Sequence, residues 1–81
     1  MRLELKLYSK ENCHLCDDAK KELELVKEEI DVVIHEVDIY QNDELLELYG
    51  LMIPVVAYKE EIIQYGKIDF LSILSFLKSK T

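Results

Sequence analysis

Apolar and polar residues alternate at the start of the chain and then change to a helical spacing. Leu3, Leu5 and Leu7 alternate with polar neighbours, which predicts a strand because successive side chains of a strand face opposite sides. After a polar stretch, apolar residues recur every three or four positions, as they do on one face of an amphipathic helix. These residues are Cys16, Ala19, Leu23, Val26 and Ile30. Asn12 is the expected N-cap of this helix, since its side-chain carbonyl can accept unpaired N–H groups of the first turn.

The middle of the chain predicts a second strand and a short helix. Residues 32–39 are rich in β-branched side chains, which favour a strand. A polar stretch then precedes Leu45, Leu48 and Tyr49, whose spacing predicts one face of a short helix. Gly50 is expected to end that helix in a left-handed conformation.

The last part of the chain predicts a hairpin and a final helix. Residues 55–58 and 62–65 are apolar runs that follow Pro54, and the few charged residues between them indicate a hairpin, although glycine is absent from the connection. From Phe70 to Leu77 the apolar spacing is again helical. The predicted order is β-α-β-α-β-β-α, an α/β fold with a parallel strand pair in its first half and an antiparallel pair in its second.

Length, charge and composition exclude several classes of function. The chain has 81 residues, enough for one domain spanning 1–81, and a formal net charge of −7, which argues against binding to nucleic acid or to an anionic membrane surface. No apolar run approaches the roughly 20 residues of a membrane span, and the first residues lack the apolar stretch of a signal peptide. We therefore expect a monomeric cytoplasmic protein.

The two cysteines carry the clearest chemistry. Cys13 and Cys16 lie where the first strand leads into the first helix. Helical residues three apart are about 5–6 Å from each other, which suits a disulfide. Cys13 would meet the positive end of the helix dipole, so we expect a thiol pKa below the ~8.5 of free cysteine, whereas Cys16 falls on the apolar stripe. An exposed attacking thiol with a shielded resolving thiol is typical of a redox pair.

Other interpretations of the pair remain open. A zinc site would need four ligands, and the chain supplies only His14 and His35 beside the two cysteines, so we predict no metal site. The cysteines could instead be small buried apolar residues of a non-catalytic interaction domain. They could also hold an iron–sulfur cluster or a soft metal between two chains, as in a carrier module.

Four segments together resemble the small bacterial glutaredoxin-like family. The first runs from Tyr8-Ser9-Lys10 to a C-H-L-C motif at Cys13-His14-Leu15-Cys16. The others are Val37-Asp38-Ile39, Tyr49-Gly50-Leu51-Met52-Ile53-Pro54-Val55 and Tyr65-Gly66-Lys67-Ile68-Asp69. The match extends over essentially the whole chain. It implies a thioredoxin-like fold with a four-stranded mixed sheet flanked by helices, and a thiol–disulfide oxidoreductase that uses protein disulfides or glutathione mixed disulfides.

The resemblance also implies residue roles. Cys13 matches the nucleophile, Cys16 the resolving cysteine, and Pro54 a cis-proline facing the pair. The backbone of Ile53 would pair with an extended peptide or with glutathione. Lys10 matches a lysine that contacts the glycine carboxylate of glutathione, while Gly66 and Asp69 align with its γ-glutamyl end.

Departures from the glutaredoxin pattern affect the same site. His14 stands where glutaredoxins usually have proline, and a protonated histidine there would lower the thiol pKa of its neighbour. Tyr65-Gly66 replaces the paired glycines of glutaredoxins, and this replacement affects how closely the γ-glutamyl end of glutathione can approach the backbone. No permanently bound cofactor is implied. Glutathione is the expected co-substrate, and a thiol reductase is an expected partner.

Overall fold

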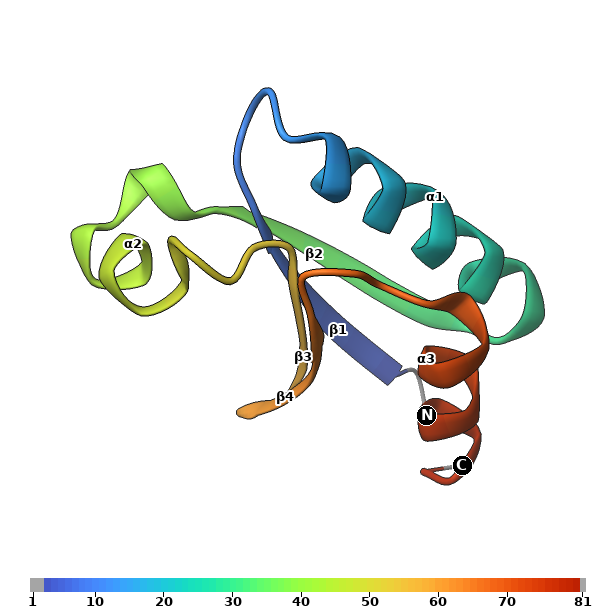
Figure 1. The fold of residues 1–81 in the computed structure, drawn as a ribbon. Coiled ribbons are helices and arrows are strands. Elements are labelled where there is room, and N and C mark those ends of the chain that lie inside the picture. The colour runs from blue at the N-terminus through green and yellow to red at the C-terminus, as the bar shows by residue number, and fades with distance from the viewer. Residues whose placement is uncertain (1–2, 81) are drawn as a thin grey trace.

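The computed structural model describes residues 3–80 and contains four strands and three α-helices. In chain order they are β1 (Leu3–Ser9), α1 (His14–Glu29), β2 (Val32–Asp38), the 3-10 helix η1 (Ile39–Gln41), α2 (Asp43–Tyr49), β3 (Val55–Tyr58), β4 (Glu61–Tyr65) and α3 (Phe70–Lys78) (Figure 1). This order confirms the predicted β-α-β-α-β-β-α arrangement. Within these residues, no helix has both the length and the apolar character needed to cross a bilayer.

The strands form one mixed sheet in the order β2-β1-β3-β4. β1 and β2 are parallel, with Leu3 opposite Val32, and α1 makes the crossover between them. β3 runs antiparallel to β1, with Tyr8 opposite Val55, and it pairs with β4 as a hairpin. The sheet therefore has the parallel and antiparallel halves that the periodicity predicts.

One face of the sheet is covered by α1 and α3 together. Leu5 and Leu7 of β1, each 1% exposed, pack in one cluster with Leu23 of α1 and Ile73 of α3. The predicted stripe on α1 is confirmed, because its four buried residues are Cys16, Ala19, Leu23 and Val26. The same amphipathic pattern that forms this helix thus holds Cys16 against the core.

The short helix α2 packs differently from the prediction. The ring of Tyr49 stacks on that of Tyr8, with centroids 4.6 Å apart, so α2 contacts the face of β1 opposite the core. Leu48 is 58% exposed, and the prediction that it shares a covered face with Leu45 and Tyr49 is wrong. The helix buries none of its residues completely.

Gly50 does not take the predicted left-handed conformation. It ends α2 with right-handed angles, φ −53° and ψ −34°. The chain continues in a tight turn in which the N–H groups of Met52 and Ile53 both donate to the carbonyl of Tyr49. Glycine is nevertheless suited to this position, since an added Cβ would lie 2.5 Å from the carbonyl oxygen of Leu46.

The predicted β3–β4 hairpin is confirmed, and its turn needs no glycine. Lys59 follows β3 directly and takes the left-handed conformation itself, with φ 57°. The register shifts between Val56 and Ala57, where the strands contain a bulge. Such a bulge increases the local twist of the hairpin.

Candidate active site

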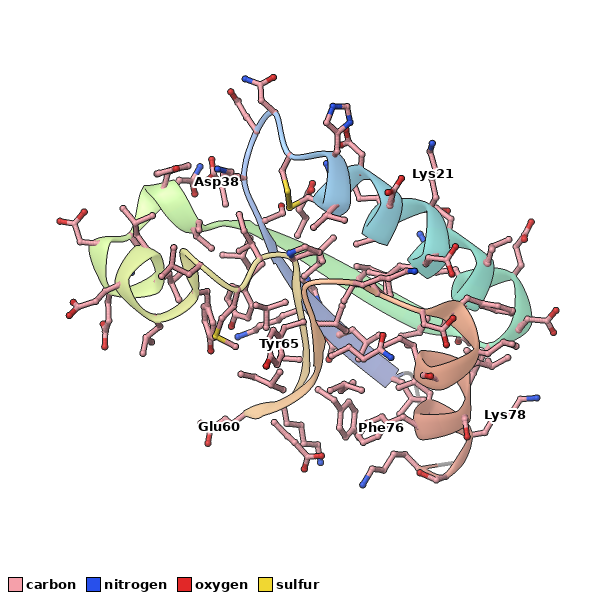
Figure 2. All side chains as sticks on the ribbon, in the orientation of Figure 1. Lys21, Asp38, Glu60, Tyr65, Phe76 and Lys78 are labelled. Atoms are coloured by element: carbon pink, nitrogen blue, oxygen red, sulfur yellow. A yellow bond between two sulfur atoms is a disulfide. The ribbon has the colours of Figure 1, made fainter. Side chains whose placement is uncertain are left out.

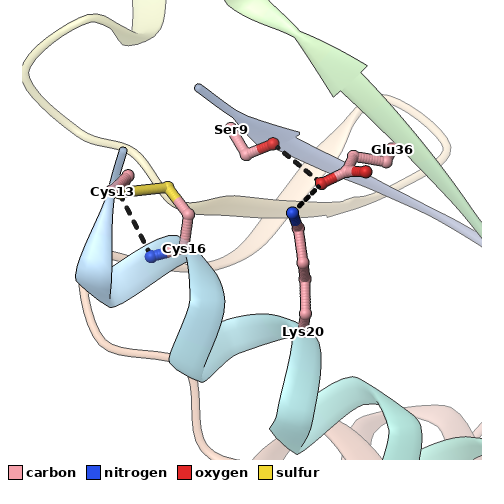
Figure 3. The surroundings of a disulfide bond; sticks show 5 residues. All are labelled: Ser9, Cys13, Cys16, Lys20 and Glu36. Carbon is pink, nitrogen blue, oxygen red and sulfur yellow. Dashed lines mark hydrogen bonds and ion pairs between the residues drawn. A yellow bond between two sulfur atoms is a disulfide. The ribbon is translucent and has the colours of Figure 1, made fainter. Parts of the chain in front are cut away.

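The two cysteines lie at the N-terminal end of α1 and form a disulfide (Figures 2 and 3). Their Cα atoms are 5.1 Å apart, within the range that a disulfide requires. β1 leads into this end of the helix, so the disulfide lies beyond the C-terminal end of β1, where the chain passes from strand to helix.

Cys13 itself caps α1, and the prediction of Asn12 as the N-cap is wrong. The sulfur of Cys13 accepts a hydrogen bond of 3.1 Å from the backbone N–H of Cys16. Its carbonyl accepts the first helical bond, from the N–H of Asp17. Asn12 instead takes a left-handed conformation, φ 55°, which asparagine tolerates and which turns the chain into the helix. The sulfur that the sequence marks as nucleophilic thus already receives an N–H bond.

The two sulfurs differ in access. Cys16 is completely buried, while Cys13 is partly exposed. A disulfide or thiolate that approaches from solvent therefore meets Cys13 first. This arrangement permits attack at one sulfur and later release by the other, because the buried thiol stays within bonding distance throughout.

The segment before β3 lies at the same end of the sheet. The pairing of Tyr8 with Val55 places Pro54 opposite Ser9, four residues before Cys13. The Ile53–Pro54 peptide bond is cis, Pro54 is fully buried and Ile53 is partly exposed. The N–H of Gly66 donates to the carbonyls of both Met52 and Pro54, at 3.0 and 2.8 Å. The end of β4 thereby holds this segment in place.

A polar network lies beside the disulfide that the sequence analysis did not identify. Ser9, only 4% exposed, donates its hydroxyl to Glu36 of β2 at 3.2 Å, and the ammonium of Lys20 lies 2.7 Å from the same carboxylate oxygen (Figure 3). The hydrogen bond to Glu36 raises the pKa of Lys20 above its ordinary value; burial opposes this, and the charges of Glu36 and Asp17 add to it.

Two signals in the sequence point to this network. Ser9 continues the alternation of Leu5 and Leu7 toward the core, which marks it as an inward-facing polar residue. Lys20 is one helical turn beyond Cys16. The partner Glu36 emerges only from the strand register, in which it lies opposite Leu7.

Lys10 and Asp69 each line a hollow in the surface, and neither cysteine lines either one. Lys10 lines a hollow of about 480 Å³, here called the Lys10 hollow, together with Ser9, Glu11, Lys20, Glu36, Val37, Asp38 and Gln41. Asp69 lines a second one of about 300 Å³, the Asp69 hollow, together with Leu15, Asp18, Lys21, Glu22, Lys67 and Ile68. Lys10 and Asp69 therefore do not share one hollow. His14 is exposed in the first turn of α1.

Gly66 and Asp69 have structural roles as well. Gly66 has a positive φ of 78°, which glycine adopts easily. Asp69 is the N-cap of α3, where its carboxylate accepts bonds from the N–H and the hydroxyl of Ser72, at 3.1 and 2.8 Å. Among residues 3–80, no group of three or more His, Cys, Asp or Glu side chains is arranged to hold a metal ion.

A family model links these features to known proteins. The model described as Glutaredoxin-like domain (DUF836) matches residues 4–78, which include the disulfide, the cis-proline segment and Asp69. No protein of curated function matches the chain.

Solved structures share the fold. The X-ray structure of target protein XcR50 from X. campestris is 27% identical, with a TM-score of 0.79, covering 93% of this chain and 96% of that one. A point-mutant thioredoxin from Halobacterium salinarum is 21% identical with a TM-score of 0.69, over 95% of this chain and 73% of that one. Thioredoxin 1 from Thermosipho africanus is 15% identical with a TM-score of 0.62, over 96% and 98%. The two thioredoxins show a common fold.

Proposed function

The chain belongs to the glutaredoxin-like domain family, and from this premise we propose that it is a thiol–disulfide oxidoreductase acting on protein disulfides or glutathione mixed disulfides. The observation that carries the proposal is the asymmetry of the cysteine pair. One sulfur is partly exposed at a helix N-terminus, and the other is completely buried within disulfide distance of it.

The reaction follows from this asymmetry. In the reduced protein, the Cys13 thiolate attacks a substrate disulfide, and one substrate sulfur leaves as a thiolate that takes a proton from water. Cys16 then loses its proton and attacks the Cys13 sulfur, which releases the second substrate thiol. The protein ends as the Cys13–Cys16 disulfide, and the substrate has gained two electrons and two protons. The N–H of Cys16 and the dipole of α1 favour the attacking thiolate.

The remaining residues serve substrate binding in this proposal. Ile53 is partly exposed ahead of the cis bond to Pro54, and its carbonyl is the group that pairs with an extended substrate in this proposal, because its N–H donates to the carbonyl of Tyr49. Lys10 supplies a cation from the segment just before the cysteines, and Gly66 and Asp69 supply groups from the segment that follows β4. His14 adds an exposed imidazole next to the nucleophile. Glutathione as co-substrate, a thiol reductase as partner, a monomeric state and a cytoplasmic location complete the proposal.

Two cysteine variants test it. Cys13→Ser keeps a good N-cap residue, and Cys16→Ala avoids leaving a hydroxyl in a buried apolar position. Each reduced protein is mixed with a disulfide-bonded peptide and examined by intact mass. We expect Cys16→Ala to accumulate a mixed disulfide, Cys13→Ser to form none, and the wild type to become fully oxidised. A wild type that stays reduced, or a Cys13→Ser variant that still forms the adduct, would overturn the proposal.

A further inference from the structure

The polar network of Ser9, Lys20 and Glu36 lies beside the resolving cysteine (Figure 3). Lys20 follows Cys16 by one helical turn, and residues at this spacing are neighbours on the surface of a helix. Figure 3 shows both side chains rising from the same side of α1 towards the sheet. The fold therefore brings the ammonium of Lys20 into the surroundings of Cys16.

A chain of two contacts holds this ammonium in place. Its nitrogen lies 2.7 Å from Oε2 of Glu36, and the hydroxyl of Ser9 donates to the same oxygen at 3.2 Å. Ser9 is almost completely buried, so it anchors the carboxylate, whereas the side chains of Lys20 and Glu36 are about half-exposed. The hydrogen bond to Glu36 raises the pKa of Lys20, burial opposes this, and the charges of Glu36 and Asp17 add to it. Lys20 therefore keeps its positive charge at neutral and moderately alkaline pH.

The second step of the proposed reaction needs a negative charge at Cys16. This thiol must lose its proton before it attacks the Cys13 sulfur. The side chain of Cys16 is completely buried, and burial disfavours the charged form of a thiol. A neighbouring positive charge has the opposite effect. A cation one turn from Cys16 therefore acts on this step more than on the first, since the partly exposed Cys13 is seven residues from Lys20.

We propose that Lys20 is a positioning residue of the resolving step: its ammonium, held by Glu36, favours the thiolate of Cys16, and the carboxylate of Glu36 moderates this effect. The inference rests on the proposed function and deepens its second step. The bond chemistry is unchanged. The Cys16 thiolate attacks the Cys13 sulfur, the disulfide forms, and the substrate sulfur leaves as a thiolate that takes a proton from water. Lys20 and Glu36 neither gain nor lose a proton.

Other titratable groups also surround the cysteine and its neighbouring ion pair. They are His14 and Asp17 on α1, and Lys10, Glu11 and Asp38, which line the Lys10 hollow. The variants described below leave all of these groups in place. Comparison of each variant with wild type at the same pH therefore cancels their contribution.

A chromogenic disulfide separates the two steps. 2,2′-Dithiodipyridine is uncharged, and each half that leaves as thiopyridone is detected by absorbance. When the reduced protein meets excess reagent, attack by Cys13 releases the first equivalent at a rate proportional to the reagent concentration. Attack by Cys16 then releases the second equivalent at a rate independent of that concentration. Stopped-flow measurements from about pH 6 to about pH 10 give the pH midpoint of each step.

The first variant is Lys20→Met, which removes the ammonium and keeps a long side chain that suits a helix. It also leaves the Glu36 carboxylate without this partner, which acts in the same direction. We expect the midpoint of the second step to rise by about one pH unit, a small shift for a neighbouring charge because the pair is half-exposed. At neutral pH this lowers the thiolate fraction about tenfold and raises thiolate reactivity about threefold, so the step becomes about threefold slower.

The second variant, Glu36→Gln, should have the opposite effect. It keeps an oxygen for Ser9 and Lys20 and removes the negative charge, so we expect a lower midpoint and a faster second step at neutral pH. Lys20→Arg keeps the positive charge and should stay close to wild type. Lys21→Met is the charge-matched control, because the Lys21 side chain points away from the molecule into solvent (Figure 2). We expect it to change neither step.

Opposite shifts in Lys20→Met and Glu36→Gln, with little change in the first step, would support the inference. Shifts in the same direction, an unchanged second step in Lys20→Met, or the same effect in Lys21→Met would overturn it and leave the oxidoreductase proposal intact. A wild type that releases no thiopyridone, or only the first equivalent, would overturn the proposed function, and this inference with it.

Discussion

Gly66 joins the end of β4 to the cis-proline segment, and replacing it with alanine tests that part of the account. Its N–H donates to the carbonyls of Met52 and Pro54, and its φ is 78°. An added Cβ would meet no other atom within 4 Å. The only expected cost of Gly66→Ala is therefore the left-handed conformation, because both hydrogen bonds are retained.

The size of this cost follows from two opposing effects. A left-handed conformation costs a residue with a Cβ about 1–2 kcal/mol relative to glycine. Alanine recovers about 0.4–1 kcal/mol, since it restricts the unfolded chain more than glycine does. We expect a net loss of about 1 kcal/mol in the free energy of unfolding. With a urea m-value of about 1 kcal/mol/M, the midpoint should fall by about 1 M and the slope should stay constant.

Urea unfolding followed by circular dichroism measures this loss. Gly66→Asn is the matched control, since asparagine tolerates the left-handed region better than alanine and should lose less stability. A loss above about 3 kcal/mol would indicate a steric clash in place of backbone strain. Equal stability of wild type and Gly66→Ala would contradict the positive φ on which the reasoning rests.

Three further predictions concern stability and reactivity. Glu36→Gln should cost about 0.5 kcal/mol at neutral pH, as for a half-exposed ion pair. Because Glu36 raises the pKa of Lys20, this contribution is complete below the ordinary lysine pKa of about 10.4 and disappears as the pH rises through the raised value, which urea unfolding from pH 7 to 11.5 would follow. Leu23→Ala should cost about 3 kcal/mol by thermal or urea unfolding, since Leu23 is 2% exposed in the core; a loss under 1 kcal/mol would contradict this packing. The alkylation rate of Cys13 with iodoacetamide should reach half its maximum below about pH 8.5, and a midpoint at or above that value would contradict the helix-terminal thiolate.

The fold was predictable where the sequence repeats an apolar spacing that places all the apolar side chains of an element on one buried face. The alternation of Leu5 and Leu7 and the spacing of Ala19 and Leu23 hold because each pattern presents one apolar face, which only one packing arrangement can bury. The burial of Cys16 was predictable for a similar reason, since Cys16 belongs to the same apolar stripe.

The errors occur where local alternatives are nearly equal in energy. Asn12 and Cys13 can both cap a helix, and the difference of one residue depends on how β1 leads into α1. Glycine adopts left-handed and right-handed angles with similar ease, and Gly50 takes the right-handed angles of the turn that the N–H groups of Met52 and Ile53 close on the Tyr49 carbonyl. Leu48 is exposed, whereas its neighbour Tyr49 stacks on Tyr8, so the covered face of this short helix differs from the one that the apolar spacing predicts.

The partners in contacts between distant segments could not be predicted from the sequence. The bond from Phe70 to Glu22 joins residues 48 positions apart, and the bond from Ser9 to Glu36 joins residues 27 apart. Both depend on how the elements pack. The bond from Ser9 to Glu36 lies beside the disulfide (Figure 3), so this part of the site required the structure.

The central claim is that Cys13 and Cys16 form a working dithiol–disulfide pair. The most direct test is their redox state in glutathione buffers of graded potential, measured by alkylation and intact mass. We predict a reversible loss of two hydrogens, with a midpoint within the roughly −120 to −270 mV spanned by known oxidoreductases. Thiols that stay reduced across the whole range would contradict the account.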